Sequence, residues 1–102
     1  MQELIVDRGE FRTVNASRYL QQLCKHFAHK VEVRYDAKSG EVALPTGPAR
    51  LTATQDTLVV ELALSSEDNS ARARHIIDSH LERFAFREDF QQMDWVLSSR
   101  YF

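Results

Sequence analysis

The spacing of the apolar residues changes at Val31, and this change constrains the fold more than any other feature of the sequence. Before Val31, apolar residues recur every three or four positions, as on one face of an α-helix. From Val31 to Asp36, apolar and polar residues alternate, which is typical of a β-strand with one face toward solvent. The sequence therefore predicts a helix followed by a sheet, each with one apolar face.

A first helix is predicted to begin after a cap at Thr13 or Asn15 and to end at about Ala28. Its apolar stripe comprises Ala16, Tyr19, Leu20, Leu23, Phe27 and Ala28. A strand candidate precedes this helix, from Glu3 to Val6 or, in a longer reading, as far as Arg12. Because the stripe occupies a single face, the helix must pack against another apolar surface.

Three further runs follow the first alternating run, and short turns separate them. They are EVALP from Glu41, RLTAT from Arg50 and TLVVELAL from Thr57. Short connections between alternating strands favour an antiparallel meander, here of four strands. One face of this sheet has to be covered.

A second helix is predicted to supply part of that cover, with caps offered by Ser65, Ser66 and Asp68. Its stripe comprises Ala73, Ile76, Ile77, Leu81, Phe84 and Ala85. We therefore predict one α+β domain over residues 1–102. It has a four-stranded antiparallel meander plus a short N-terminal strand, with two helices on one face, in the order β-α-β-β-β-β-α. The tail that contains Trp95 could form a last short strand, plug the edge of the core or serve as an exposed contact.

Composition and charge narrow the function classes. The 102 residues fit one hydrophobic core, and the formal net charge of −2 disfavours binding to nucleic-acid phosphates. Cys24 is the single cysteine, so no internal disulfide can form, and a reducing cytoplasm is the expected location. The N-terminus does not have the pattern of a signal peptide, and no apolar run is long enough to span a membrane.

Basic residues lie beside or within the apolar stripe of each predicted helix. The candidate ligand-binding residues are His26, His29, His80, Arg83 and Arg87. At about 100° per residue, His26 and Arg83 fall on the margins of their stripes, and His80 falls inside its stripe. If the two helix edges adjoin in the fold, they form one positively charged rim.

The same residues allow other readings. His26, His29 and His80 are candidate ligands of a metal ion or haem, although Cys24 projects away from His26 on the helix. A buried His80 can also be a core residue that is hydrogen-bonded to a backbone carbonyl. Cys24 could act as a nucleophile, but no glycine-rich loop or strained turn accompanies it, so we expect no covalent catalysis.

Three segments, SRYLQQLCKHFAHKVEVRYD, GEVALPTG and IIDSHLERFAFRED with a following tryptophan, resemble a bacterial family known as domain of unknown function 2218. The hallmark segments of that family are similar to Lys25–Lys30 and His80–Arg87. The resemblance implies a small bacterial cytosolic protein of unassigned activity. Its association with siderophore-interacting flavoproteins hints at iron handling, and it assigns no catalytic residue.

The leading hypothesis is a non-enzymatic binding or accessory domain for an anionic small molecule or an acidic partner protein. Arginine and protonated imidazole both suit contacts to carboxylate or phosphate oxygens. The alternatives are a metal- or haem-binding protein, and a structural protein-interaction domain that uses the sheet face or the aromatic tail. Neither the identity of a cofactor nor the oligomeric state follows from the sequence.

Overall fold

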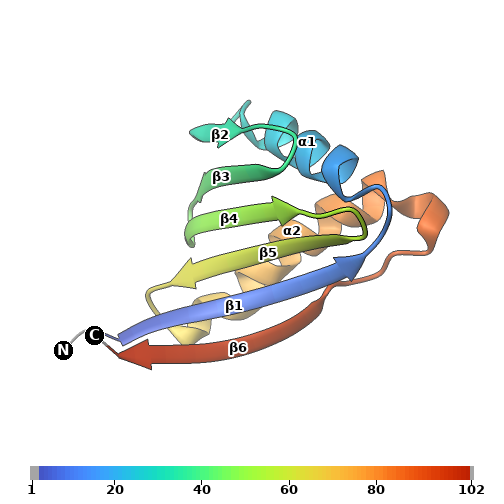
Figure 1. The fold of residues 1–102 in the computed structure, drawn as a ribbon. Helices are drawn as coiled ribbons and strands as arrows, with labels where there is room; N and C mark the ends of the chain where they lie inside the picture. Colours follow the sequence, from blue (N-terminus) through green and yellow to red (C-terminus); the bar gives the residue numbers. More distant parts are fainter. Residues whose placement is uncertain (1–2, 102) are drawn as a thin grey trace.

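The computed structural model describes residues 3–101 and confirms the predicted α+β class. Six antiparallel strands form one sheet, and two α-helices cover one of its faces (Figure 1). The elements in chain order are β1 (Glu3–Arg12), α1 (Ala16–Phe27), β2 (Val33–Tyr35), β3 (Ser39–Leu44), β4 (Gly47–Ala53), β5 (Thr57–Leu64), the 3-10 turn η1 (Glu67–Asn69), α2 (Ser70–Phe84), the 3-10 turn η2 (Phe86–Glu88) and β6 (Asp94–Tyr101).

The strands are ordered β2-β3-β4-β5-β1-β6 across the sheet. The predicted meander is present as β2 to β5, although β2 spans only three residues. The N-terminal strand is not short: β1 has ten residues and lies between β5 and β6, which agrees with the longer reading to Arg12. The tail forms the strand β6, which the predicted order lacked and which pairs with β1.

The hydrophobic core lies between the helices and the sheet, as the stripes predicted. The buried residues of α1 are Ala16, Tyr19, Leu20, Leu23, Cys24 and Phe27, and those of α2 include Ala73, Ile77 and Leu81. Ala28, which we had placed in the stripe, is exposed because the helix ends at Phe27. Each fully buried leucine contributes roughly 2 kcal/mol through removal of its side chain from water.

The residues predicted to cap the two α-helices do not form simple N-cap hydrogen bonds with them. Asn15 occupies the cap position of α1 without a side-chain cap hydrogen bond, while the Thr13 hydroxyl accepts a hydrogen bond from the Asn15 backbone N–H at 3.0 Å. The Ser66 hydroxyl accepts from the Asp68 N–H and so begins the turn η1 rather than α2. Gly47, with φ of 130°, allows the tight connection between β3 and β4.

The alternation of each strand separates two environments. In β5, Leu58, Val60, Leu62 and Leu64 face the helices and are buried, while the residues between them are partly exposed on the opposite face. No α-helix covers this second face in the part of the chain that the structure describes (Figure 1). Among these residues, no helix is both long enough and apolar enough to cross a membrane.

Candidate functional site

The last turns of α1 and α2 meet, so the two helix edges do adjoin. The ring centroids of His26 and His80 lie 4.7 Å apart, and those of Phe27 and His80 lie 4.9 Å apart. Phe84 adds an edge-on contact to His26 at 6.1 Å. Two of the predicted site residues, from helices more than 40 residues apart in the chain, are therefore in direct contact.

His80 is partly buried, and its hydrogen bond fixes which ring nitrogen carries a proton. Its Nδ1 lies 2.5 Å from the carbonyl oxygen of Ile76, one turn earlier in α2. Because a carbonyl can only accept, Nδ1 donates and carries the hydrogen. In the neutral ring, Nε2 is then the nitrogen with a free lone pair.

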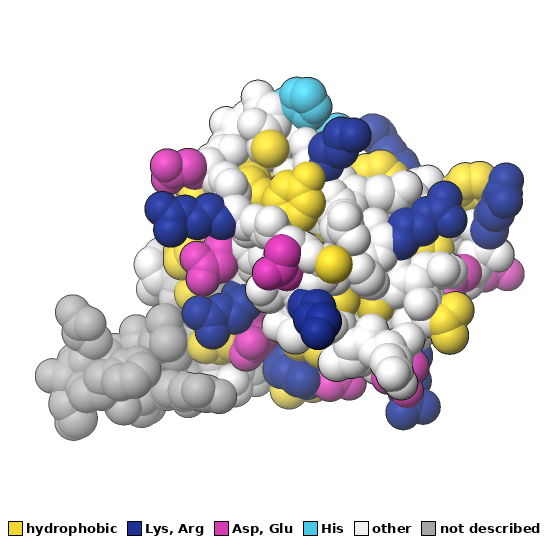
Figure 2. All heavy atoms as spheres, turned by 45° about the horizontal axis from the view of Figure 1, so that its top comes forward, with side chains coloured by type: hydrophobic (Ala, Val, Ile, Leu, Met, Phe, Trp, Pro, Cys, Tyr) yellow, Lys and Arg dark blue, Asp and Glu magenta, His cyan; other side chains and the backbone are white. Residues whose placement is uncertain are grey.

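Basic side chains surround His26. Burial lowers the pKa of His26 from its ordinary value of 6.5, and the neighbouring His80, Lys30, His29 and Arg83 lower it further. A positive charge on any of these groups raises the local electrostatic potential, which disfavours a further proton on His26. Figure 2 shows histidine at the upper edge of this view of the molecule, with lysine or arginine side chains beside it. We call His26, His80 and Arg83 the helix-end cluster.

The other two predicted site residues lie farther out. His29 is exposed in the turn after α1, within electrostatic range of His26. Arg87 lies beyond the end of α2, in η2, where its guanidinium is 5.6 Å from the centre of the Phe86 ring. The rim is therefore formed mainly by His26, His80 and Arg83, with His29 at its border.

The arrangement of the side chains is also relevant to a metal site and to Cys24 as a nucleophile. Within residues 3–101, no group of three or more His, Cys, Asp or Glu side chains is arranged to hold a metal ion. Cys24 is fully buried, and burial raises the pKa of its thiol to about 11. A thiol with this pKa is protonated at neutral pH and is a poor nucleophile.

Sequence reasoning missed a buried ion pair between the sheet and α2. The Asp7 carboxylate is completely buried and accepts hydrogen bonds from Arg74 Nε at 2.5 Å, Arg74 Nη2 at 2.8 Å and Ser70 Oγ at 2.6 Å. The longer reading of β1 contained the signal for this pair, because it places Asp7 on the same strand face as Ile5.

A hydrogen bond links Trp95 to α2 beside this ion pair. The Asp78 carboxylate accepts from Trp95 Nε1 at 2.9 Å and from the Met93 N–H at 3.0 Å, and the Arg74 guanidinium lies 5.7 Å from the Trp95 ring centre. Burial nonetheless raises the pKa of Asp78 above its ordinary value. These residues line a groove of about 510 Å³ between α2 and the segment before β6.

Comparison with known proteins confirms the resemblance to a family. Residues 8–96 match the model of a family described as uncharacterized protein conserved in bacteria (DUF2218). The chain belongs to the DUF2218 family. The match includes both helical segments that carry the helix-end cluster, as well as Asp7's partner Arg74.

A solved structure supports the fold assigned to this DUF2218 member. The chain is similar to PA4090 from Pseudomonas aeruginosa, determined by NMR, with 27% sequence identity and a TM-score of 0.66. The similarity covers 98% of this chain and 96% of that chain. No curated protein matches the chain significantly.

Proposed function

We propose that this protein is a cytoplasmic, non-enzymatic binding domain that receives an anionic group at the helix-end cluster. One observation carries this proposal: basic side chains converge there without acidic partners. The ion pairs among the described side chains are Arg8–Glu10, Arg50–Glu41 and Arg74–Asp7, and none involves His26, His80 or Arg83.

An anion would relieve the repulsion within the cluster. Protonation of His26 is opposed by four neighbouring basic groups, and a bound carboxylate or phosphate would favour the protonated imidazole. The Arg83 guanidinium can donate two parallel hydrogen bonds to such a group. His29 and Arg83 are exposed, so the site is open to a carboxylate-bearing small molecule.

Citrate is a suitable probe because it carries several carboxylates and can be supplied alone or as its ferric complex. NMR titration of the histidine ring protons would follow binding, and Arg83→Ala should weaken it about tenfold, which corresponds to one charge-assisted contact. Arg72→Ala removes an exposed arginine from the other end of α2 and serves as the matched control. Equal affinity of the two variants for citrate would contradict the proposal.

The pH dependence gives a second readout of the same titration. Since the anion favours protonated His26, citrate should bind more tightly as the pH falls from 7 toward the lowered pKa of that residue. Bound citrate should in turn raise the pKa of His26. The same pH dependence in His26→Ala, a comparison that cancels the protonation of citrate itself, would exclude a role for His26.

A metal-binding function is the second candidate, favoured by the contact between the two imidazoles and the free Nε2 of His80. Ferric citrate separates the two candidates. Tighter binding of the ferric complex than of citrate, lost in His26→Ala, would favour iron handling through metal coordination. Equal binding of both probes would favour simple recognition of the anion.

A further inference from the structure

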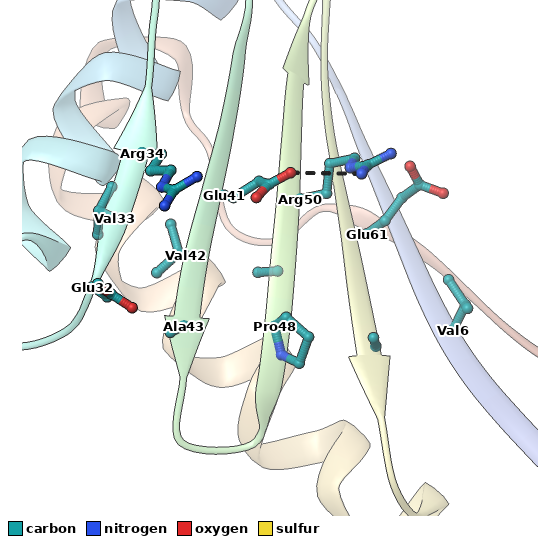
Figure 3. Close-up of a pocket in the computed structure, with 12 residues that line it drawn as sticks. Val6, Glu32, Val33, Arg34, Glu41, Val42, Ala43, Pro48, Arg50 and Glu61 are labelled. Carbon is teal, nitrogen blue, oxygen red and sulfur yellow. Dashed lines mark ion pairs between the residues drawn. The ribbon is translucent and has the colours of Figure 1, made fainter.

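The face of the sheet that points away from the helices has a shallow hollow of about 620 Å³ (Figure 3). Small apolar side chains form its floor: Ala43 pairs with Pro48 across β3 and β4, and Val6 pairs with Ala63 across β1 and β5. Charged side chains cross the hollow beside this floor. Such a face combines apolar area with charge and is suited to contact with another macromolecule.

The charged side chains form a row in which the sign alternates from strand to strand. Arg34 of β2 pairs with Glu41 of β3, Glu41 pairs with Arg50 of β4, and Arg50 pairs with Glu61 of β5. Figure 3 shows all four on the same side of the sheet. Arg8 follows on β1, but it forms an ion pair with Glu10 of its own strand.

Within one chain, the charges of this row form no strong ion pair with one another. Arg50 and Glu41 approach to 3.6 Å, with side chains that are 67% and 64% exposed, so this ion pair is weak. Among the side chains of residues 5–98, Arg34 and Glu61 take part in no ion pair. The row can therefore still pair with charges on a second surface.

We propose that this face binds a second copy of the same chain, with a two-fold axis parallel to the strands between β3 and β4. A row of four alternating charges reverses its sign on reflection about its midpoint. The two-fold axis therefore places each charge opposite an unlike one: Glu41 faces Arg50 of the partner subunit, and Arg34 faces Glu61 of the partner subunit. The same axis places Ala43 on Pro48 of the partner subunit, and the strands of the two sheets stay nearly aligned, as in a β-sandwich.

The size of the face sets the strength of this contact. The strands β2 to β5 have three, six, seven and eight residues. At about 4.8 Å between strands and about 3.4 Å per residue, they cover roughly 400 Å² per copy, about half of a standard interface. The dimer is therefore weak, depends on protein concentration and, because its charges are exposed, dissociates at high salt.

Sedimentation equilibrium over a concentration series at low salt tests the proposal with two charge reversals. In Arg50→Glu, or in Glu41→Arg, both central contacts become repulsive, and the dimer dissociation constant should rise at least about tenfold. In an equimolar mixture of the two variants, every contact again joins unlike charges, so a heterodimer should form at wild-type concentrations. Arg72→Glu, on the helix side, carries the same charge change and should leave the dimer intact.

Recovery of a heterodimer in the mixture would distinguish this interface from one on any other surface. All variants should keep the wild-type circular dichroism spectrum, because the residues changed are exposed. A wild-type chain that stays monomeric at low salt would overturn the proposal and leave the face to a different partner or ligand. Dimers that resist both single reversals, or single variants that do not associate when mixed, would place the contact elsewhere.

Discussion

Asp7 is the residue whose environment departs most from what its chemistry prefers. A carboxylate without contact to water is costly unless charged donors replace the water, and here Arg74 and Ser70 supply three hydrogen bonds. Arg74 itself is only partly covered, with 32% of its side chain exposed. The pair joins β1, which lies next to the edge strand β6, to the first turns of α2, so it positions that helix as well as neutralising a charge.

Asp7→Ala should therefore destabilise the fold strongly. Removing the acceptor leaves Arg74 and Ser70 without their partner, and breaking a buried pair in this way costs about 3–5 kcal/mol. Urea unfolding followed by circular dichroism would measure the loss. Glu41→Ala, which breaks the exposed ion pair with Arg50, should cost less than about 1 kcal/mol. Similar losses in the two variants would show that burial of Asp7 has no energetic consequence.

Glu88 connects elements at opposite ends of the chain. Its carboxylate accepts hydrogen bonds from Thr13 Oγ1 at 2.7 Å, from Asn15 Nδ2 at 3.2 Å and from the Tyr19 hydroxyl. Burial acts to raise the pKa of Glu88, but the three hydrogen bonds together lower it below its ordinary value of 4.5. These hydrogen bonds link the start of α1 to the turn η2 that follows α2.

This lowered pKa predicts how the stability depends on pH. A group with a depressed pKa in the folded state stabilises the fold at neutral pH, and this contribution is lost as the pH falls below 4.5 through the folded pKa. Glu88→Gln should therefore be less stable than wild type by about 1 kcal/mol at pH 7, a modest value because Glu88 is exposed. The difference should shrink toward pH 3 in thermal unfolding experiments. Glu67→Gln, an exposed change in η1, should show no such trend.

The types of the elements could be predicted because periodicity is local. Leu20 and Leu23, or Leu58 and Val60, reveal the helix or strand from neighbours a few positions away. The contact of His26 with His80 required knowledge of how two helices pack, and the sequence could indicate only that each lies near a stripe. The Asp7–Arg74 pair spans 67 residues, a separation at which no periodic signal exists.

At the scale of the whole molecule, Gly9 and Trp95 join β1 to β6. The two residues are directly paired, and a Cβ atom at Gly9 would lie 2.8 Å from atoms of the Trp95 ring. The absence of a side chain thus lets the indole lie across β1 and reach Asp78 of α2. Gly9 thereby allows Trp95 to contact both β1 and α2.

Gly9→Ala should displace this tryptophan. The added methyl group overpacks the site, which costs about 1–3 kcal/mol, and should break the hydrogen bond from Trp95 Nε1 to Asp78. Because Trp95 is the single tryptophan of the chain, a shift of its fluorescence emission would report the displacement directly. Ser98→Ala, on the exposed side of β6, should change neither the emission nor the midpoint of thermal unfolding.

The position of β1 between β5 and β6 has a consequence for how the chain folds. Ile5 pairs with Leu64, and Glu3 pairs with Tyr101, so the first strand finds its neighbours only across most of the chain. The hairpins of β2 to β5 can form early from nearby residues, whereas closing loops of this length is slow. During synthesis on the ribosome, β1 is made before both of its neighbours. One edge of β1 can pair once β5 has been made, but the other edge is exposed to other chains until β6 arrives.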